Sequence, residues 1–475
     1  MQVVLHVTVL QRRWVRSMKQ VASQQAPVEQ RREVPPGLVY FLGALGAILW
    51  GYDNGVIAGA LLFMTEEFHL GPAAQGVVSS SLAIGAGAGA VVSGALANPL
   101  GRKRLVFIAS LVFMGGTLAW ATSGSVAMLV VGRIVIGVGI GIVSVSVPIY
   151  LAEISPARIR GRIGALTQLM IASGILLSYV VGYALSPFEA WRWMVAFALA
   201  PALVLIAGIW VLPESPRWLL TRGRDEEARE ELARQVPAHE VEQAMREMRE
   251  TFHRAKPSWR EGFRPGVRRI VLVAVGLAVL TQLLGINTIT YYAPTILKSI
   301  GFSEEASLLN TIGFGIVSII FTVLASRLLD GWGRRPLLMV GALVMGLSMT
   351  TMAVLSWTAG LTLGASGIIA IACLVVFKAM FSLSWGTSSR IVIAEILPLR
   401  VRGSALGIAE VFNFASTFAL SLTFPILLAA GSGLAFVLFG VMGLLACLFV
   451  GVLVPETKGK TLEEIEAEML PADKR

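Results

Sequence analysis

The segment AEISPARIRG at residues 152–161 returns 242 residues later as AEILPLRVRG at residues 394–403. A second motif, PES at residues 213–215, returns at the same spacing as PET at residues 455–457. A chain of 475 residues is long enough to hold two units of this size. We therefore predict two homologous halves, each ending in a Pro-Glu pair.

Apolar runs fill most of each half. The chain is 55% hydrophobic and only 14% charged, a composition far from that of an ordinary soluble protein. About 20 apolar residues span a bilayer as a helix. Such runs lie near 38–62, 72–97, 104–122, 126–150, 162–185 and 191–212, and again near 268–292, 304–328, 335–357, 363–393, 403–430 and 434–454. The sequence predicts an all-α membrane protein with twelve transmembrane helices in two six-helix repeats, an arrangement typical of secondary transporters.

The positive charges predict how the helices are oriented. The net charge is +10, and the basic motifs fall in alternate connections: GRKR (101–104), ARIRGR (157–162), GRRP (333–336) and LRVRG (399–403). Cytoplasmic loops carry an excess of Lys and Arg. Both termini are therefore expected to be cytoplasmic. The positive net charge is explained by the orientation of the chain in the lipid bilayer and does not indicate nucleic-acid binding.

These boundaries predict five parts of the chain. The loop between the halves has helical spacing with many opposite charges four residues apart, so it is expected to form amphipathic helices. The parts are a disordered N-terminal tail (1–36), an N-terminal six-helix bundle (37–212), a cytoplasmic helical loop (213–266), a C-terminal six-helix bundle (267–455) and a cytoplasmic C-terminal tail (456–475).

Metal or nucleophilic chemistry has almost no support in the sequence. The two cysteines, Cys373 and Cys447, lie in apolar helices without metal-site spacing, and the four histidines are scattered. We expect no metal, no cofactor and no enzymatic activity.

Asp53 lies inside the first apolar run. A charge in the hydrocarbon region costs about 2.5 to 3.5 kcal/mol on insertion scales, so such residues face a cavity and find a partner. Asp53 lies roughly 14 Å from the outer end of its helix and Arg133 lies roughly 10 Å from the same side in the fourth helix, at 1.5 Å per residue. These depths predict an ion pair. Its role is either proton coupling or purely structural.

Four long motifs resemble one family. GRIVIGVGIGIVSVSVPIYLAEISPARIRG (132–161), PESPRWLL (213–220), DGWGRRP (330–336) and PETKGKTLEEIE (455–466) are similar to those of the sugar porter branch of the major facilitator superfamily, and most resemble those of bacterial proton-coupled glucose and xylose symporters. The resemblance implies proton symport of a hexose or pentose by alternating access. It also implies a multi-pass protein of the bacterial inner membrane that works as a monomer. A facilitative sugar or polyol uniporter and a non-transporting sugar sensor remain the alternatives.

The resemblance also implies which residues form the site. Asp53 and Arg133 match the proton-coupling carboxylate and its partner. Amides both donate and accept hydrogen bonds, which suits sugar hydroxyls. The matching substrate-binding residues are the amides Gln168, Gln282, Asn287 and Asn413, the aromatics Tyr291 and Trp50, and the smaller polar residues Thr281 and Ser318. Hydrogen bonds that only hold helices together are the alternative role for these amides.

Several positions depart from the family pattern. Thr281 and Ser318 stand where Gln and Asn are usual, and WGTSSR replaces WGPxxW, which puts Arg390 in place of a pocket Trp. Glu410 stands where the family is usually apolar. Arg390 and Glu410 lie at similar depths, roughly 7 to 11 Å from the cytoplasmic edge. We predict an ion pair between them. The alternative is that each reaches water separately, and an unpaired Arg390 would be free to bind an anionic substrate.

A cytoplasmic charge network is the last expectation. Asn98 replaces the Asp that is usual in the loop between the second and third helices, whereas the corresponding Asp330 is present. The network is expected to comprise Glu153, Arg158, Arg160, Glu214, Asp330, Arg334, Arg335, Glu395, Arg400, Arg402 and Glu456. These arginines also set the topology, and both roles can hold together.

Overall fold

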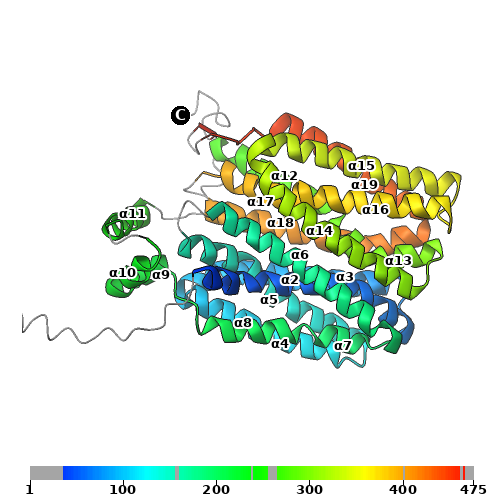
Figure 1. Ribbon diagram of the computed structural model, residues 1–475, viewed down its shortest axis with the longest axis horizontal. Coiled ribbons are helices and arrows are strands. Elements are labelled where there is room, and N and C mark those ends of the chain that lie inside the picture. The colour runs from blue at the N-terminus through cyan, green and yellow to red at the C-terminus, as the bar shows by residue number, and fades with distance from the viewer. Residues whose placement is uncertain are drawn as a thin grey trace, which may run out of the picture. The chain divides into compact units, whose positions relative to one another are not determined.

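The computed structural model describes residues 36–155, 160–236, 239–254, 265–398, 402–460 and 464–465. Every regular element in these ranges is a helix, and no strand is present there. Twelve helical spans are long and apolar enough to cross a membrane, as the sequence predicts (Figure 1). The described residues from Tyr40 onward form one compact unit.

The first six spans run from α2 to α8. They comprise α2 (Pro36–Glu67), α3 (Pro72–Leu100), α4 (Arg102–Ala121), α5 (Val126–Ile154), α6 (Arg160–Leu185) with the short η2 (Ser186–Phe188), and the pair α7 (Trp191–Ala196) and α8 (Leu199–Ile209). The second six comprise α12 (Pro265–Leu283) with α13 (Ile286–Ile300), α14 (Glu304–Trp332), α15 (Arg334–Thr358), α16 (Ala365–Leu383) with α17 (Trp385–Ile396), α18 (Arg402–Ala430) and α19 (Ser432–Leu453).

The chain order gives the bundle two distinct ends. At one end α3 turns into α4 and α14 turns into α15, and the basic motifs GRKR and GRRP lie there; we call it the basic end. At the other end α2 turns into α3 and α13 turns into α14. We call it the tyrosine end, because Tyr291 and Tyr292 of α13 lie toward it.

The seventh span is broken where α12 meets α13. Gly285 separates them with φ +95°, a left-handed conformation that side chains rarely adopt. A Cβ atom built on Gly285 would also lie 2.6 Å from a ring carbon of Phe439. Both constraints require glycine, and the break places Gln282 and Asn287 on either side of it.

The two halves pack against each other through equivalent helices. The second helix of the first half, α3, lies against the fifth helix of the second half, α18. The reciprocal pair, α14 and α6, is also in contact. These four helices therefore form the junction of the two halves, and ligand sites in transporters built from repeats lie at such a junction.

Three shorter helices lie at the basic end: α9 (Pro216–Thr221), α10 (Asp225–Ala233) and α11 (Val241–Arg254) (Figure 1). They share a small apolar core formed by Trp218, Leu219, Ala228, Leu232, Val241 and Met245. Their charged faces are exposed, and ion pairs such as Arg249–Asp225 at 2.7 Å cross between α11 and α10. The sequence predicts amphipathic helices in 213–266, and the described part of that loop has this form.

Candidate functional site

Asp53 and Arg133 form an ion pair in the interior of the bundle. Nη1 of Arg133 lies 2.9 Å from both carboxylate oxygens of Asp53. The pair is sealed, because the Arg133 side chain is 0% exposed and that of Asp53 is 2% exposed. The guanidinium carbon also lies 4.9 Å from the ring centre of Trp120. A buried pair of this kind is costly to break by removing one partner, since the other charge would be left alone.

The pair leaves part of the guanidinium unused. Nη2 of Arg133 makes a long contact of 3.5 Å to the carbonyl oxygen of Ser79, its Nε has no hydrogen-bond partner, and the Tyr291 hydroxyl also lies close to the guanidinium. One nitrogen therefore carries both bonds to Asp53, instead of the two parallel bonds of a forked pair. This arrangement leaves Arg133 with donors to spare when the carboxylate changes its position or charge.

The residue after Asp53 bonds to the opposite half. Asn54 Oδ1 accepts a hydrogen bond of 2.8 Å from the hydroxyl of Tyr291 on α13. The next residue, Tyr292, donates a bond of 2.8 Å to Ser79 Oγ on α3. All four side chains are buried. Sequence analysis identifies Tyr291 but misses Asn54, Ser79 and Tyr292, which are ordinary polar residues in apolar runs.

The halves are joined at the tyrosine end. Tyr179 donates to the carbonyl oxygen of Thr290, and Lys298 pairs with Glu66 at 3.1 Å. Among the described residues, every side-chain hydrogen bond between the first and second sets of six spans lies in the tyrosine half of the bundle. These contacts hold the two halves together at the tyrosine end.

Three of the predicted substrate amides form a chain across the break in the seventh span. Asn287 Nδ2 donates to Gln282 Oε1 at 2.8 Å, and Gln282 Nε2 donates to Asn413 Oδ1 at 2.7 Å. Asn413 Nδ2 then donates to Glu410 Oε2 at 3.1 Å. The chain orients every amide in it. Glu410, which the resemblance does not explain, is its terminal acceptor.

Gln168, Trp50 and Arg390 lie around one face of α17. A Cβ atom on Gly386 would lie 3.4 Å from Nε2 of Gln168, so the amide faces the start of this helix. Gln168 makes no hydrogen bond within the described part of the chain, so its amide is available to a ligand. One turn further along, the guanidinium of Arg390 lies 4.6 Å from the ring centre of Trp50.

Arg390 and Glu410 are not paired with each other in this structure. Arg390 lies over Trp50 of the opposite half, and the Glu410 carboxylate accepts from Asn413. The two residues lie at similar depths along the membrane normal, as the sequence predicts. Depth does not determine the direction in which each helix points its side chain.

The two smaller predicted residues use their hydroxyls within the protein. Thr281 Oγ1 donates to the carbonyl oxygen of Leu277 on its own helix at 2.7 Å. Ser318 Oγ lies 2.8 Å from Ser382 Oγ, and both residues are buried. Neither hydroxyl is free in this conformation, unlike the amide of Gln168.

Lys378 is a buried basic residue that sequence analysis misses. It lies on α16, is 4% exposed, and its Nζ lies 2.9 Å from Thr290 Oγ1. Among the described residues no carboxylate lies within ion-pair distance of it. The signal was available, because Lys378 interrupts an apolar run just as Asp53 does.

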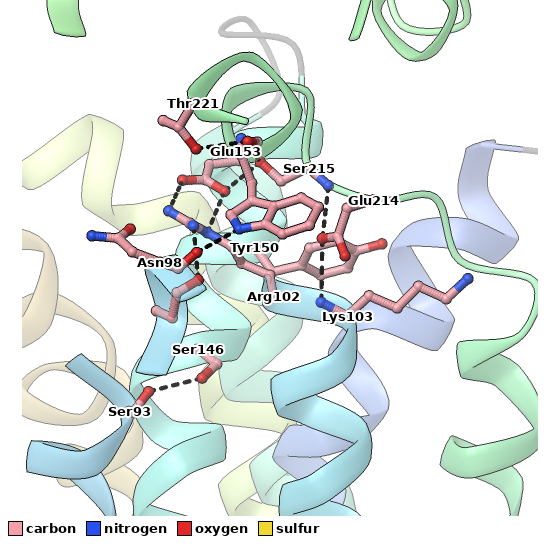
Figure 2. Close-up of polar contacts among 12 residues, drawn as sticks. Ser93, Asn98, Arg102, Lys103, Ser146, Tyr150, Glu153, Glu214, Ser215 and Thr221 are labelled. Carbon is pink, nitrogen blue, oxygen red and sulfur yellow. Dashed lines mark hydrogen bonds and ion pairs between the residues drawn. The ribbon is translucent and has the colours of Figure 1, made fainter. Parts of the chain in front are cut away.

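The charged residues of the basic end form a duplicated cluster. Arg102 pairs with Glu153 at 2.9 Å, and Ser215 donates to the same carboxylate (Figure 2). The second half repeats this as Arg334 with Glu395 at 3.6 Å. Each of these contacts lies within one half, where it holds the helix ends together.

Glu214 and Glu456 cap the helices that begin at the basic end. Glu214 accepts from the backbone N–H of Lys103 at 3.3 Å, and Glu456 accepts from those of Arg334 and Arg335 at 3.0 and 3.1 Å. A carboxylate is favoured at a helix N-terminus. Burial alone would raise the pKa of Glu456, but the backbone hydrogen bonds from Lys458, Arg334, Arg335 and Thr457 together outweigh it and lower the pKa below its usual value.

Asn98 takes part in the cluster through its backbone. Its carbonyl oxygen accepts from Trp218 Nε1 at 2.7 Å and from Arg222, which tie α9 to the end of α3. Arg158 and Arg400 lie outside the described residues, and so do the side chains of Arg160, Asp330 and Arg402. Among the described residues no group of His, Cys, Asp and Glu side chains is placed to hold a metal ion.

Comparison with known proteins gives a consistent result. The profile of the family "Sugar (and other) transporter" matches residues 39–469. The glucose transporter GlcP of Staphylococcus epidermidis is 40% identical over 433 residues, which cover 91% of this chain and 97% of that protein.

Solved structures of the xylose transporter XylE have the same fold. The proton:xylose symporter XylE bound to 6-bromo-6-deoxy-D-glucose is 32% identical, with a TM-score of 0.77 and coverage of 91% of this chain and 98% of that chain. A partially occluded inward-open structure of XylE from E. coli is 31% identical, with a TM-score of 0.79 and coverage of 90% and 99%.

Proposed function

This chain belongs to the sugar transporter family, and from that premise we propose that it takes up a monosaccharide by proton symport through alternating access. Its twelve apolar helices and bacterial relatives make it a multi-pass protein of a bacterial plasma membrane. It is a transporter and not an enzyme. The substrate, the coupling to protons and the action as a monomer are the proposed parts.

The observation that carries the proposal is the position of Asp53. It is sealed in an ion pair with Arg133, and the adjacent Asn54 holds Tyr291 of the opposite half. Protonation of Asp53 removes the charge that attracts Arg133, so α2 is no longer held to α5 by a full ion pair. Because Asn54 is on the same turn, a shift of α2 there also changes the contact that closes the tyrosine end.

The cycle follows from this linkage. We place the tyrosine end outside, because the basic motifs mark the cytoplasmic side. In the outward-open state Asp53 is reached by protons and substrate from outside. Occupancy of both lets the tyrosine end close, and both then leave toward the basic end. Re-formation of the Asp53–Arg133 pair then resets the empty carrier.

The substrate contacts are assigned to the amides and the aromatic ring near α17. Gln168 has an unused amide, and Asn287, Gln282 and Asn413 are oriented by one another. Trp50 offers an apolar face to a sugar ring. The relatives support the substrate class, since GlcP is a glucose transporter and XylE a xylose symporter.

Uptake by energised cells with and without an uncoupler tests the proposal. A proton symporter accumulates substrate in energised cells, and the uncoupler abolishes accumulation while leaving equilibration intact. A uniporter equilibrates to the same level with or without the uncoupler. A sensor does not move the substrate at all.

A further inference from the structure

The charges inside the bundle do not balance. Beyond the first and last turns of the membrane-spanning helices, five charged side chains of the described residues are buried or partly buried. Three are basic (Arg133, Lys378 and Arg390) and two are acidic (Asp53 and Glu410). With all five ionised, the interior carries one positive charge in excess.

Arg390 is the cation that a ligand can reach. Arg133 is sealed against Asp53, and Lys378 is 4% exposed and bonded to Thr290. Arg390 is only partly buried, has no carboxylate partner among the described residues, and its guanidinium carbon lies 4.6 Å from the centre of the Trp50 ring. Within the described part of the chain its N–H groups make no hydrogen bond, and a guanidinium over an aromatic ring can still offer them to a ligand.

The neighbouring groups are those of a sugar site. Gly386 and Arg390 lie one helical turn, about 6 Å, apart along α17, and the Gln168 amide lies beside Gly386. Glu410 does not neutralise Arg390, because it is bonded to Asn413 in the amide chain. A ligand between α17 and the first half would therefore contact the neutral amide of Gln168, the aromatic ring of Trp50 and the N–H donors of the Arg390 guanidinium.

We propose that Arg390 binds the carboxylate of a sugar acid, so that the preferred substrate is a monoanionic monosaccharide such as a uronate or an aldonate. The inference rests on the proposed function and refines its substrate class. A planar guanidinium and a carboxylate form two parallel hydrogen bonds. The anion also offsets one positive charge of the interior, which a neutral sugar leaves in place at low dielectric.

The charge balance has a consequence for transport. One proton carried with one monoanion moves no net charge, whereas one proton carried with a neutral hexose moves one positive charge inward. Uronate uptake should therefore respond to a pH gradient and not to a membrane potential. Hexose uptake by the same cycle should respond to both.

The test uses the full chain in proteoliposomes and two ligands that differ only at carbon 6, glucuronate and glucose. We expect glucuronate to bind at least tenfold more tightly than glucose in the wild type, and its uptake to be unaffected by a potassium diffusion potential set with valinomycin. Galacturonate, galactose and gluconate extend the comparison to other stereochemistry and to an open-chain acid.

Variants locate the effect at Arg390. A hydrogen bond to a charged group is worth about 1.5 to 3 kcal/mol, so Arg390→Gln should weaken the uronate relative to the hexose by about 10- to 150-fold. Arg390→Lys, which keeps the charge without the fork, should retain part of the preference. Arg327→Gln removes an exposed arginine of α14 and should leave the preference intact.

The outcomes separate this inference from the proposed function. If glucose accumulates with a proton gradient and no sugar acid competes with it, the sugar-acid inference is wrong and the symport proposal stands. The sugar-acid inference is also wrong if Arg390→Gln weakens both ligands equally. If sugars and sugar acids only equilibrate and never accumulate, the symport proposal itself fails. The wild-type ligand comparison decides the matter even where an Arg390 variant does not fold.

Discussion

Asp53 and Asn54 are consecutive residues of α2 that bind different halves of the protein. Asp53 is paired with Arg133 of α5 at 2.9 Å, and Asn54 accepts a hydrogen bond of 2.8 Å from Tyr291 of α13. Any movement of α2 that loosens the first contact is transmitted to the second. The proposed coupling between proton binding and closure of the tyrosine end depends on this adjacency.

Replacing Asp53 by Asn should abolish accumulation and preserve exchange. The amide cannot release a proton, so net symport stops, whereas exchange of labelled for unlabelled substrate requires no net proton movement. Counterflow and energised uptake in the same vesicles give both quantities. Accumulation by Asp53→Asn at the wild-type level would remove this residue from proton coupling.

Replacing Tyr291 by Phe should open the tyrosine end. The lost hydrogen bond is worth about 0.5 to 1.5 kcal/mol, which shifts the ratio of closed to open molecules by roughly 2- to 12-fold. Distances between spin labels on the 67–72 and 300–304 turns report this ratio, after Cys373 and Cys447 are changed to Ser. Tyr150→Phe is the matched control, because its hydroxyl bonds to Pro213 within one half. An equal shift in both variants would argue against a gate at Tyr291.

Alanine at Gln168 or Asn287 should weaken substrate affinity with normal expression. Each change removes a proposed hydrogen bond to the substrate, worth about 0.5 to 1.5 kcal/mol. Loss of Asn287 also leaves the Oε1 acceptor of Gln282 without its donor. Competition binding should show a loss of a few-fold to more than tenfold. Unchanged affinity in both variants would place the site elsewhere.

Gly285→Ala should lower stability by more than about 1 kcal/mol, since a left-handed φ and a Cβ contact of 2.6 Å with Phe439 are imposed together. Gly313→Ala is the control on α14, where a Cβ atom meets nothing within 4 Å and the helix gains about 0.5 to 1 kcal/mol. Thermal unfolding in detergent measures both. Equal melting temperatures for the two variants would contradict the requirement for glycine at the break.

Glu456→Gln should lower stability in a pH-dependent way. Burial raises the pKa of Glu456, but backbone hydrogen bonds outweigh it and hold the pKa below its unfolded value. A depressed pKa contributes stability that is complete above the unfolded pKa and is lost as the pH falls through the folded pKa. Wild type and variant should therefore differ at neutral pH and converge in acid. A difference that grows in acid would reverse the sign and reject the capping role.

The fold was accessible from the sequence because the bilayer imposes length and apolarity on each span. The PES and PET repeat places Glu214 and Glu456 at equivalent positions of the two halves, whereas neither their capping role nor the break at Gly285 was predicted from the sequence. The sequence does not predict the contacts between the two halves in the same way. Depth along the membrane predicts the level of a residue but not its direction around the helix, which is why Asp53 meets Arg133 whereas Arg390 faces Trp50 instead of Glu410.

Polar residues within apolar runs also indicate positions that form contacts inside the bundle, and the charged ones are the easiest to recognise. Asp53 is distinguished from its apolar neighbours by its charge, and Lys378 is distinguished in the same way. Asn54 and Ser79 carry no charge, so their cost in an apolar helix is too small to distinguish them from residues that bond within their own helix. Their role depends on Tyr291 and Tyr292, which approach only after the halves have come together.

Proton movement on substrate addition tests the central claim most directly. Substrate is added to de-energised vesicles in an unbuffered medium, and the external pH is recorded beside the entry of labelled substrate. Symport predicts alkalinisation in step with entry for the wild type, and none for Asp53→Asn. Substrate entry into wild-type vesicles without any alkalinisation would contradict proton symport and make the protein a uniporter.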